Sequence, residues 1–175
     1  MKIAISGPMC SGKTTIANLI NENNNYNIYS FGQKIKDIAN ELFDMNKDFK
    51  DRSLLINIAD KMRDIDPDVW INQILQQTTG KRNCIIDDVR YQNEVDALIK
   101  DGWIFIQLDV PYTIQKQRIM KLYPNNYQEH LDAMNHVSEQ NNFIFPDGYP
   151  HLRLKTSDEN QEKNKHEINL LSLKE

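Results

Sequence analysis

The sequence predicts an α/β protein with one parallel β-sheet that carries helices on both faces. Short apolar runs alternate along the chain with segments whose apolar residues recur at helical spacing, the pattern of strands buried between two helical layers. The first apolar run leads through a glycine-containing turn into such a helical segment, as in a strand–turn–helix unit. The 175 residues are enough for one well-packed core and too few for two ordinary domains.

Strands and helices are predicted in turn through the first half of the chain. Apolar runs that end at polar residues or glycine predict strands at 2–6 and 28–31. Apolar residues at helical spacing predict helices from about 12 to 22, from about 35 to 44, and over 54–62.

Residues 65–78 carry the signals of a helix start. Asp66 is predicted to cap this helix, with Pro67 at its first position. Ile65 and Trp70 stand at the positions of a hydrophobic staple around that cap.

The second half continues the alternation. Strands are predicted at 84–86, 104–110 and 152–154, and helices over 91–99, from 111 onward and from 156 to about 173. Thr156 and Glu159 have capping-box spacing at the start of the last helix. Residues 121–150 are rich in Asn, Tyr, Pro and Gln with weak periodicity, which predicts a mobile insert rather than a linker between domains.

Composition limits the class of partner and the compartment. The formal net charge is -4, whereas a protein that grips nucleic acid is usually basic, so no nucleic-acid partner is expected. Cys10 and Cys84 have no CxxC spacing, which favours a reducing compartment without disulfides. No segment approaches the apolar length of a membrane span or of a signal peptide. We therefore expect a cytoplasmic protein with no membrane partner.

Residues 7–14, Gly-Pro-Met-Cys-Ser-Gly-Lys-Thr, match the phosphate-binding pattern G-x-x-x-x-G-K-[ST]. Glycines let such a loop curl until successive backbone N–H groups point at one anion, and the next helix adds its positive N-terminal end. Lys13 is expected to reach the β- and γ-phosphates of ATP, and the Thr14 hydroxyl to bind their Mg²⁺. The predicted ATP-binding residues are Gly7, Pro8, Met9, Cys10, Ser11, Gly12, Lys13, Thr14 and Thr15.

The rest of the chain favours a small-molecule kinase. A switch GTPase needs N-K-x-D, and residues 46–49 read Asn-Lys-Asp-Phe, while large motor and transporter ATPases need a longer chain. Asp87 and Asp88 follow an apolar run, where a carboxylate beside the phosphate loop can hold the water shell of Mg²⁺. Arg90 then falls just past the carboxyl edge of the sheet, where ligands bind in open α/β folds. The alternative reading is that the two aspartates cap the next helix.

Several segments resemble the phage-type deoxynucleoside monophosphate kinases, within the P-loop nucleoside monophosphate kinase superfamily. IIDDVRYQNEVDALIKDGW resembles their D-V-R-F-x-N-E…G segment, and YSFGQKIKDIANELF resembles their S-F-A-x-x-L-K helix. LLINIADKMRDIDPDVWI resembles L-L-Q-x-x-G-T-x-x-R…D-x-W, and NHVSE resembles H-x-S-E. Animal phosphomevalonate kinases share a looser form of this pattern. The resemblance implies a three-layer sandwich with five parallel strands in the order 2-3-1-4-5, as a single kinase domain over residues 1–175. It also implies an acceptor-binding insert at about 32–80 and a lid at about 118–145.

The resemblance also implies roles for individual residues. The implied catalytic residues are Lys13, Asp88, Arg90 and Arg118. The implied substrate-binding residues are Lys36, Arg63, Trp70, Arg90 and Glu94. Mg²⁺ would be held by Thr14 and Asp88, largely through water. Asn93 also matches a family position, whereas Gln33 stands where many relatives have Asp.

Other readings stay open for some of these side chains. Arg63 is otherwise a surface partner of a neighbouring aspartate, and Arg118 and Lys36 are otherwise solvated helix residues. Trp70 either stacks on a base or packs in the core. His136 is either structural or orders a closed lid through the NHVSE segment.

The function predicted on this basis is transfer of phosphate from ATP to a (deoxy)nucleoside monophosphate in the cytoplasm, or in the host cytoplasm if the protein is viral. A phosphate acceptor is already largely ionised, since its second pKa is about 6, so no general base is needed. The alternatives are a kinase of another acceptor, such as phosphomevalonate or a nucleoside, and a non-catalytic ATP-binding regulator. The Asp51-Arg52-Ser53 segment is similar to a motif of deoxynucleoside kinases, but its position favours a helix cap. The resemblance favours a homodimer.

Overall fold

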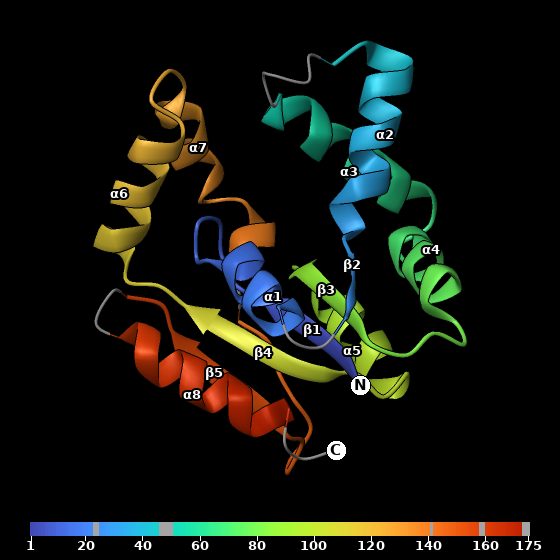
Figure 1. Cartoon of the computed structure of the whole chain (residues 1–175). Helices are drawn as coiled ribbons and strands as arrows, with labels where there is room; N and C mark the ends of the chain where they lie inside the picture. The colour runs from blue at the N-terminus through green and yellow to red at the C-terminus, as the bar shows by residue number, and fades with distance from the viewer. Residues whose placement is uncertain (23–24, 46–50, 141, 158–159, 173–175) are drawn as a thin grey trace.

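Five parallel strands form the central layer, in the order β2-β3-β1-β4-β5 (Figure 1). They are β1 (Lys2–Ser6), β2 (Asn27–Tyr29), β3 (Cys84–Val89), β4 (Ile104–Asp109) and β5 (His151–Lys155). The computed structural model describes residues 1–22, 25–45, 51–140, 142–157 and 160–172. The predicted fold class and strand order are confirmed.

Helices cover both faces of this sheet. They are α1 (Lys13–Asn21), α2 (Phe31–Phe43), α3 (Arg52–Ile65), α4 (Val69–Thr78), α5 (Gln92–Lys100), α6 (Tyr112–Leu122), α7 (Tyr127–Ala133), the short 3₁₀ helix η1 (Val137–Glu139) and α8 (Gln161–Ser172). Successive strand residues point to opposite faces, so Ile3 and Ile5 pack with α1 and α8, whereas Ala4 packs with α2–α5. Two apolar cores result, one on each face, as expected for a three-layer sandwich.

Two helical arms stand beside the carboxyl edge of the sheet. In Figure 1, α2 and α3 project on one side of the loop between β1 and α1, and α6 and α7 project on the other. The predicted insert at 121–150 contains α7 and η1. Its later part is held at the start of α5, because the Gln92 side chain donates to Ile144 O and accepts from Ile144 N, both at 2.9 Å.

The predicted helix start at Asp66 is wrong. Helix α3 runs on to Ile65, and the Asp66 N–H still donates to Met62 O at 3.0 Å, so Asp66 ends α3 instead of starting α4. Its carboxylate accepts from the backbone of Asp68, the residue that precedes α4. No staple forms, because Ile65 is 81% exposed on the last turn of α3 while Trp70 is buried.

The predicted capping box at the last helix involves Glu159, which lies outside the described residues. Thr156, its other member, is buried, and its hydroxyl donates to Asp109 O at 3.2 Å. Among the helices that the structure describes, none combines the length and the apolar character needed to cross a bilayer.

Candidate active site

The loop between β1 and α1 makes a tight turn that leaves no room for a side chain at its first residue. Gly7 cannot carry a side chain, because a Cβ there would lie 2.6 Å from Ser11 Oγ and 3.0 Å from Leu108 Cβ. Gly12 has φ of 95°, in the left-handed region that favours glycine, and Cys10 adopts the same region with φ of 59°. These turns bring the start of α1 back over the end of β1, which is the geometry that an anion-binding loop requires.

Lys13 lies folded onto this loop. Its Nζ donates to Gly7 O at 2.7 Å and to Pro8 O at 2.8 Å. Burial, and then the positive charge of Arg90, lower the pKa of Lys13 to about 8. The ammonium group is therefore held beside the loop by two backbone carbonyls. Its lowered pKa means that it begins to lose its charge at a pH of about 8.

Thr14 and Asp87 form a pair of oxygen ligands next to Lys13. The Thr14 hydroxyl donates to Asp87 Oδ2 at 3.0 Å. Burial and the neighbouring charge of Asp88 raise the pKa of Asp87 above its usual range, while the Thr14 hydrogen bond and Lys13 oppose the rise. A hydroxyl and a carboxylate are the oxygen donors that Mg²⁺ prefers, so this pair fits Mg²⁺ held together with phosphate oxygens.

Asp88 is placed differently from the metal role that the sequence implied. Its carboxylate accepts from Ser30 Oγ at 2.6 Å and from the backbone N–H groups of Phe31 and Gly32, both at 2.8 Å. Asp88 therefore caps the start of α2. Asp87 and Asp88 are consecutive in β3, at the point where its register with β1 shifts, and they contact different helices: Asp87 contacts Thr14 of α1, and Asp88 contacts the start of α2. Of the two carboxylates, Asp87, bonded to the Thr14 hydroxyl, has the placement that fits the water shell of a Mg²⁺ ion.

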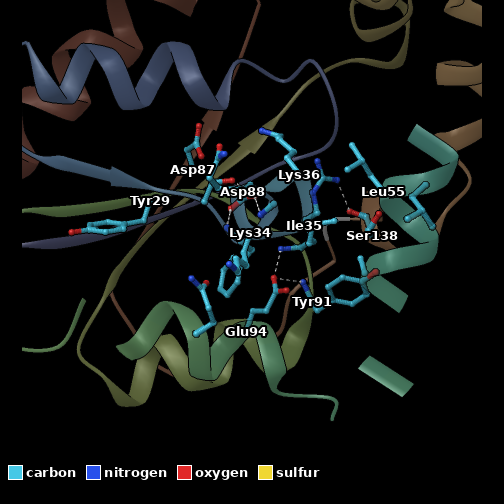
Figure 2. A pocket seen from close by; sticks show the side chains of 18 of the residues that line it. Tyr29, Lys34, Ile35, Lys36, Leu55, Asp87, Asp88, Tyr91, Glu94 and Ser138 are labelled. Carbon is cyan, nitrogen blue, oxygen red and sulfur yellow. Dashed lines mark hydrogen bonds between the residues drawn. The ribbon is translucent and has the colours of Figure 1, made fainter. Parts of the chain in front are cut away.

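A cavity of about 730 Å³ opens between the start of α2, α3 and α5. Figure 2 shows Lys36 from α2, Asp87 and Asp88 from β3 and Glu94 from α5 around it. The cations on its wall are Lys13, Lys34, Lys36, Arg52, Arg63 and Arg90. This concentration of positive side chains in a chain of net charge -4 marks the cavity as a site for an anion.

Arg63 stands in this cavity between two carboxylates and an aromatic ring. Its guanidinium lies 3.3 Å from Asp60 Oδ1 and 3.5 Å from Glu94 Oε1, and 4.1 Å from the centre of the Tyr91 ring. Arg63 thus pairs with the neighbouring Asp60, as one reading expected, and also lines the cavity, as the other expected.

Glu94 works chiefly as a support for its neighbours. It is buried, and its Oε2 accepts from the backbone N–H groups of Arg90 at 2.7 Å and Tyr91 at 3.1 Å, which fixes the start of α5. Burial outweighs these hydrogen bonds and the Arg63 charge and raises the pKa of Glu94 to about 7. Glu94 therefore positions Arg63 and the Arg90 backbone.

Arg90 connects the sheet edge to η1. Its Nη1 donates to Ser138 O at 3.2 Å and to the Glu139 carboxylate. Burial opposes the charge, but the carboxylates of Glu139 and Asp88 outweigh it and raise the pKa of Arg90. Glu139 Oε2 also accepts from Met9 N at 2.5 Å, so one carboxylate joins η1 to both the loop and Arg90.

Three residues implied by the resemblance lie away from the cavity or on its rim. Trp70 is 3% exposed, and its Nε1 donates to Ala59 O at 3.2 Å, so the core alternative is correct and Trp70 offers no surface for base stacking. Asn93 donates to Pro67 O at 3.2 Å and to Asp68 Oδ1, which ties α5 to the turn before α4. Gln33 is exposed and donates to Asp37 at 2.9 Å.

A second cavity, of about 840 Å³, lies on the other side of the loop. It is bounded by residues 10–15, by Arg118 and Tyr123 of the α6 arm, and by Thr156 after β5. Arg118 Nη1 donates to Cys10 O at 3.2 Å, which brings α6 onto the loop. Lys13 and Thr14 line both cavities, so the two spaces meet at these side chains.

Two further residues, Arg52 and Glu139, have contacts with the site that the sequence does not predict. The sequence places Arg52 only in a segment that favours a helix cap, and Glu139 only at the end of the NHVSE segment. Their partners lie far along the chain: Arg52 bonds to His130, and Glu139 bonds to Met9. Only the fold brings those partners together.

The parallel sheet and the curled Gly-Lys-Thr loop define a P-loop protein with the architecture of small-molecule kinases. The family model described as an AAA domain matches residues 3–143, and the chain belongs to this family. No curated protein matches the chain.

Solved structures share the fold at low identity. A gluconokinase from Sinorhizobium meliloti 1021 is 14% identical, with 97% of this chain and 92% of that chain covered and a TM-score of 0.57. A shikimate kinase from Acinetobacter baumannii in complex with shikimate is 16% identical, with 99% and 93% covered and a TM-score of 0.58. A dephospho-CoA kinase from Campylobacter jejuni is 14% identical, with 99% and 96% covered and a TM-score of 0.52. Likeness at these identities establishes the fold.

Proposed function

We propose that this protein transfers the γ-phosphoryl group of ATP to a (deoxy)nucleoside monophosphate, giving ADP and the diphosphate. The observation that carries the proposal is the meeting of two cavities at Lys13 and Thr14. One cavity is bounded by the phosphate loop, and the other is lined by cations. A donor and an anionic acceptor bound in them would face each other across these two side chains.

The second cavity is the donor site in this proposal. Loop N–H groups and Lys13 would bind the β- and γ-phosphates, and Arg118 and Tyr123 would flank the nucleoside. Thr14 and Asp87 would hold Mg²⁺, which supplies charge neutralisation at the phosphate oxygens when bound. The segment 118–145, which holds the end of α6 together with α7 and η1, would act as the lid that excludes water from this site.

The first cavity is the acceptor site. Lys36, Arg63 and Arg90 lie on its wall and can bind an anionic acceptor. In the reaction an oxygen of the acceptor phosphate forms a bond to the γ-phosphorus while the bond from that phosphorus to the β-phosphate oxygen breaks. The acceptor oxygen is already ionised, so no proton has to be removed. The protein's task is alignment and charge stabilisation.

An alcohol acceptor is the second candidate, because the gluconokinase and the shikimate kinase share the fold. Such an acceptor needs a base to take its proton. Two of the carboxylates on the cavity wall are committed elsewhere, Asp88 to the start of α2 and Glu94 to the start of α5. The abundance of arginine on the wall favours an acceptor that is itself a phosphate.

A coupled ADP-release assay across acceptor classes tests the proposal. The acceptors are deoxynucleoside and nucleoside monophosphates, nucleosides, phosphomevalonate, gluconate and shikimate, each with MgATP. We expect ADP release with at least one nucleoside monophosphate, and its loss in Lys13→Ala. Release with an alcohol acceptor alone would replace the proposal by the second candidate. ATP binding without release for any acceptor would indicate a regulator.

A further inference from the structure

Arg52 is a buried cation for which the proposed reaction has so far no use. It is the first residue of α3, its side chain is 13% exposed, and it lines the acceptor cavity. Asp51 caps the helix beside it by accepting from Leu54 N at 2.9 Å. The cap accounts for Asp51 and leaves the burial of the neighbouring guanidinium unexplained.

The guanidinium is held in a fixed orientation by the α6–α7 arm. Arg52 Nε donates to His130 Nδ1 at 2.9 Å. His130 is fully buried and stacks on Tyr123, with ring centres 3.7 Å apart and 22° between the planes. This support sets the plane of the guanidinium, so that its Nη1 lies 3.7 Å from Glu139 Oε1.

The Glu139 carboxylate marks a point where groups that bind anions converge. It accepts from Met9 N of the phosphate loop and from Arg90 at the end of β3, and Arg52 approaches it from α3. The side chain of Glu139 is 2% exposed. A backbone amide and two guanidinium groups, brought from three separate parts of the chain to one carboxylate, would equally suit the oxygens of a phosphoryl group.

We propose that Arg52 is a catalytic residue that contacts the transferring phosphoryl group beside Arg90, in the cavity that both guanidinium groups line, next to the Glu139 carboxylate that orients them. This inference rests on the proposed kinase function. Arg52 takes no proton in the step. It stabilises the negative charge of the phosphoryl oxygens while the bond to ADP breaks and the bond to the acceptor oxygen forms, which is how arginine assists other phosphoryl transfers. His130 and Glu139 are the positioning residues that present it.

A purely structural role for Arg52 makes a different prediction. If it only tied α3 to α7 through His130, its loss would lower stability and leave the chemical step of folded protein unchanged. Arg52→Met keeps much of the side-chain volume and removes the charge. Arg82→Met is the matched control, because Arg82 is exposed just before β3 and lines neither cavity.

The first measurement is transfer to the acceptor found in the ADP-release assay. We expect Arg52→Met to lower kcat by roughly 100-fold or more, with the KM for ATP changed little. Arg82→Met should match wild type. Added guanidinium ion should restore part of the activity of Arg52→Ala, which a structural role would not produce. A kcat within about threefold of wild type, at full occupancy of folded enzyme, overturns the inference.

The second measurement needs no acceptor and therefore separates this inference from the proposed function. Affinity for ADP with Mg²⁺ is measured with and without aluminium fluoride, which mimics the phosphoryl group in flight. We expect Arg52→Met to keep the ADP affinity of wild type and to lose most of the gain from aluminium fluoride. The inference is overturned if aluminium fluoride raises ADP affinity equally in both proteins. It is also overturned if Arg52→Met weakens ADP binding by the same factor with and without aluminium fluoride. If no acceptor supports transfer by wild type, the proposed function fails, and this measurement still decides the role of Arg52.

Discussion

The Thr14 hydroxyl and the Asp87 carboxylate lie 3.0 Å apart, and Thr14 lines both cavities. Asp88, the next residue, accepts from backbone N–H groups at the start of α2 and so caps that helix. We therefore expect the two adjacent aspartates to have separable roles, Asp87 toward Mg²⁺ and Asp88 toward the fold. That separation gives a direct comparison between two isosteric variants.

Asp87→Asn should reduce transfer and raise the Mg²⁺ concentration needed for half-maximal rate. The amide keeps the size and can still accept from Thr14, but it removes the negative charge that favours the cation. We expect a loss of roughly 100-fold at low Mg²⁺ that added Mg²⁺ partly restores, as measured by initial rates in a Mg²⁺ titration. Asp88→Asn should instead lower the melting temperature and leave the Mg²⁺ requirement unchanged. If Asp88 rather than Asp87 held the Mg²⁺ ion, only Asp88→Asn would raise the Mg²⁺ concentration needed for half-maximal rate.

Arg90→Ala should lower transfer by at least ~100-fold while ATP binding survives. Arg90 lines only the acceptor cavity, so its charge is placed to act on the acceptor and the transferring group. The measurement is kcat together with the affinity for ATP from a direct binding titration. Arg153→Ala is a suitable control, because Arg153 is exposed and pairs with Asp109. A parallel loss of ATP affinity would contradict the acceptor-side assignment.

The affinity for MgATP should fall as the pH rises above about 8. Burial holds the pKa of Lys13 near 8, and only the protonated ammonium attracts phosphate. Below that pH the charge is present, and above it each pH unit should weaken binding by up to about tenfold. The measurement is the ATP dissociation constant between pH 7 and 9.5. Lys13→Met should bind more weakly at every pH and show no such decline, and an equal decline in both proteins would rule out Lys13 as its source.

Glu94→Gln should change how stability depends on pH. Glu94 has a pKa of about 7 in the folded protein, against 4.5 for an unperturbed glutamate. The folded state therefore binds more protons than the unfolded state between these values, and wild type should lose stability as the pH rises from 4.5 to 7. Each pKa unit is worth about 1.4 kcal/mol, so between pH 5 and pH 7.5 wild type should lose about 2.5 kcal/mol more stability than Glu94→Gln. Denaturant unfolding at pH 5 and pH 7.5 measures it, and parallel stability curves for the two proteins would contradict the assignment.

The elements of the sheet could be predicted from the sequence because their signals are local. The strands at 2–6 and 104–110 are apolar runs, and Gly102 ends α5 with the positive φ, 78°, that such a stop favours. The phosphate loop was equally visible, since its residue types follow from backbone geometry within eight consecutive positions. The start of α4 was misplaced because Asp66 and Asp68 are both good cap residues, and the longer extent of α3 decided between them.

The site could be predicted only in part, because its geometry depends on contacts between distant segments. The resemblance favours Asp88 over Asp87, and only the contacts of Asp87 with α1 and of Asp88 with the start of α2 separate the two. Trp70 carried the right chemistry for stacking on a base, but the packing of α4 against α3 buries it. The Glu139 carboxylate meets Met9 across 130 positions of sequence, and no local pattern encodes such a contact.

The central claim is that a loop-bound nucleotide passes its terminal phosphoryl group across Lys13 and Thr14 to an anionic acceptor. Incubation with ATP labelled in the γ-phosphate, in the presence of Mg²⁺ and a mixture of deoxynucleoside monophosphates, tests it most directly. The account predicts labelled deoxynucleoside diphosphate as the main product, and its disappearance in Lys13→Ala. Label found only in inorganic phosphate, or retained in ATP whatever monophosphate is supplied, would contradict it.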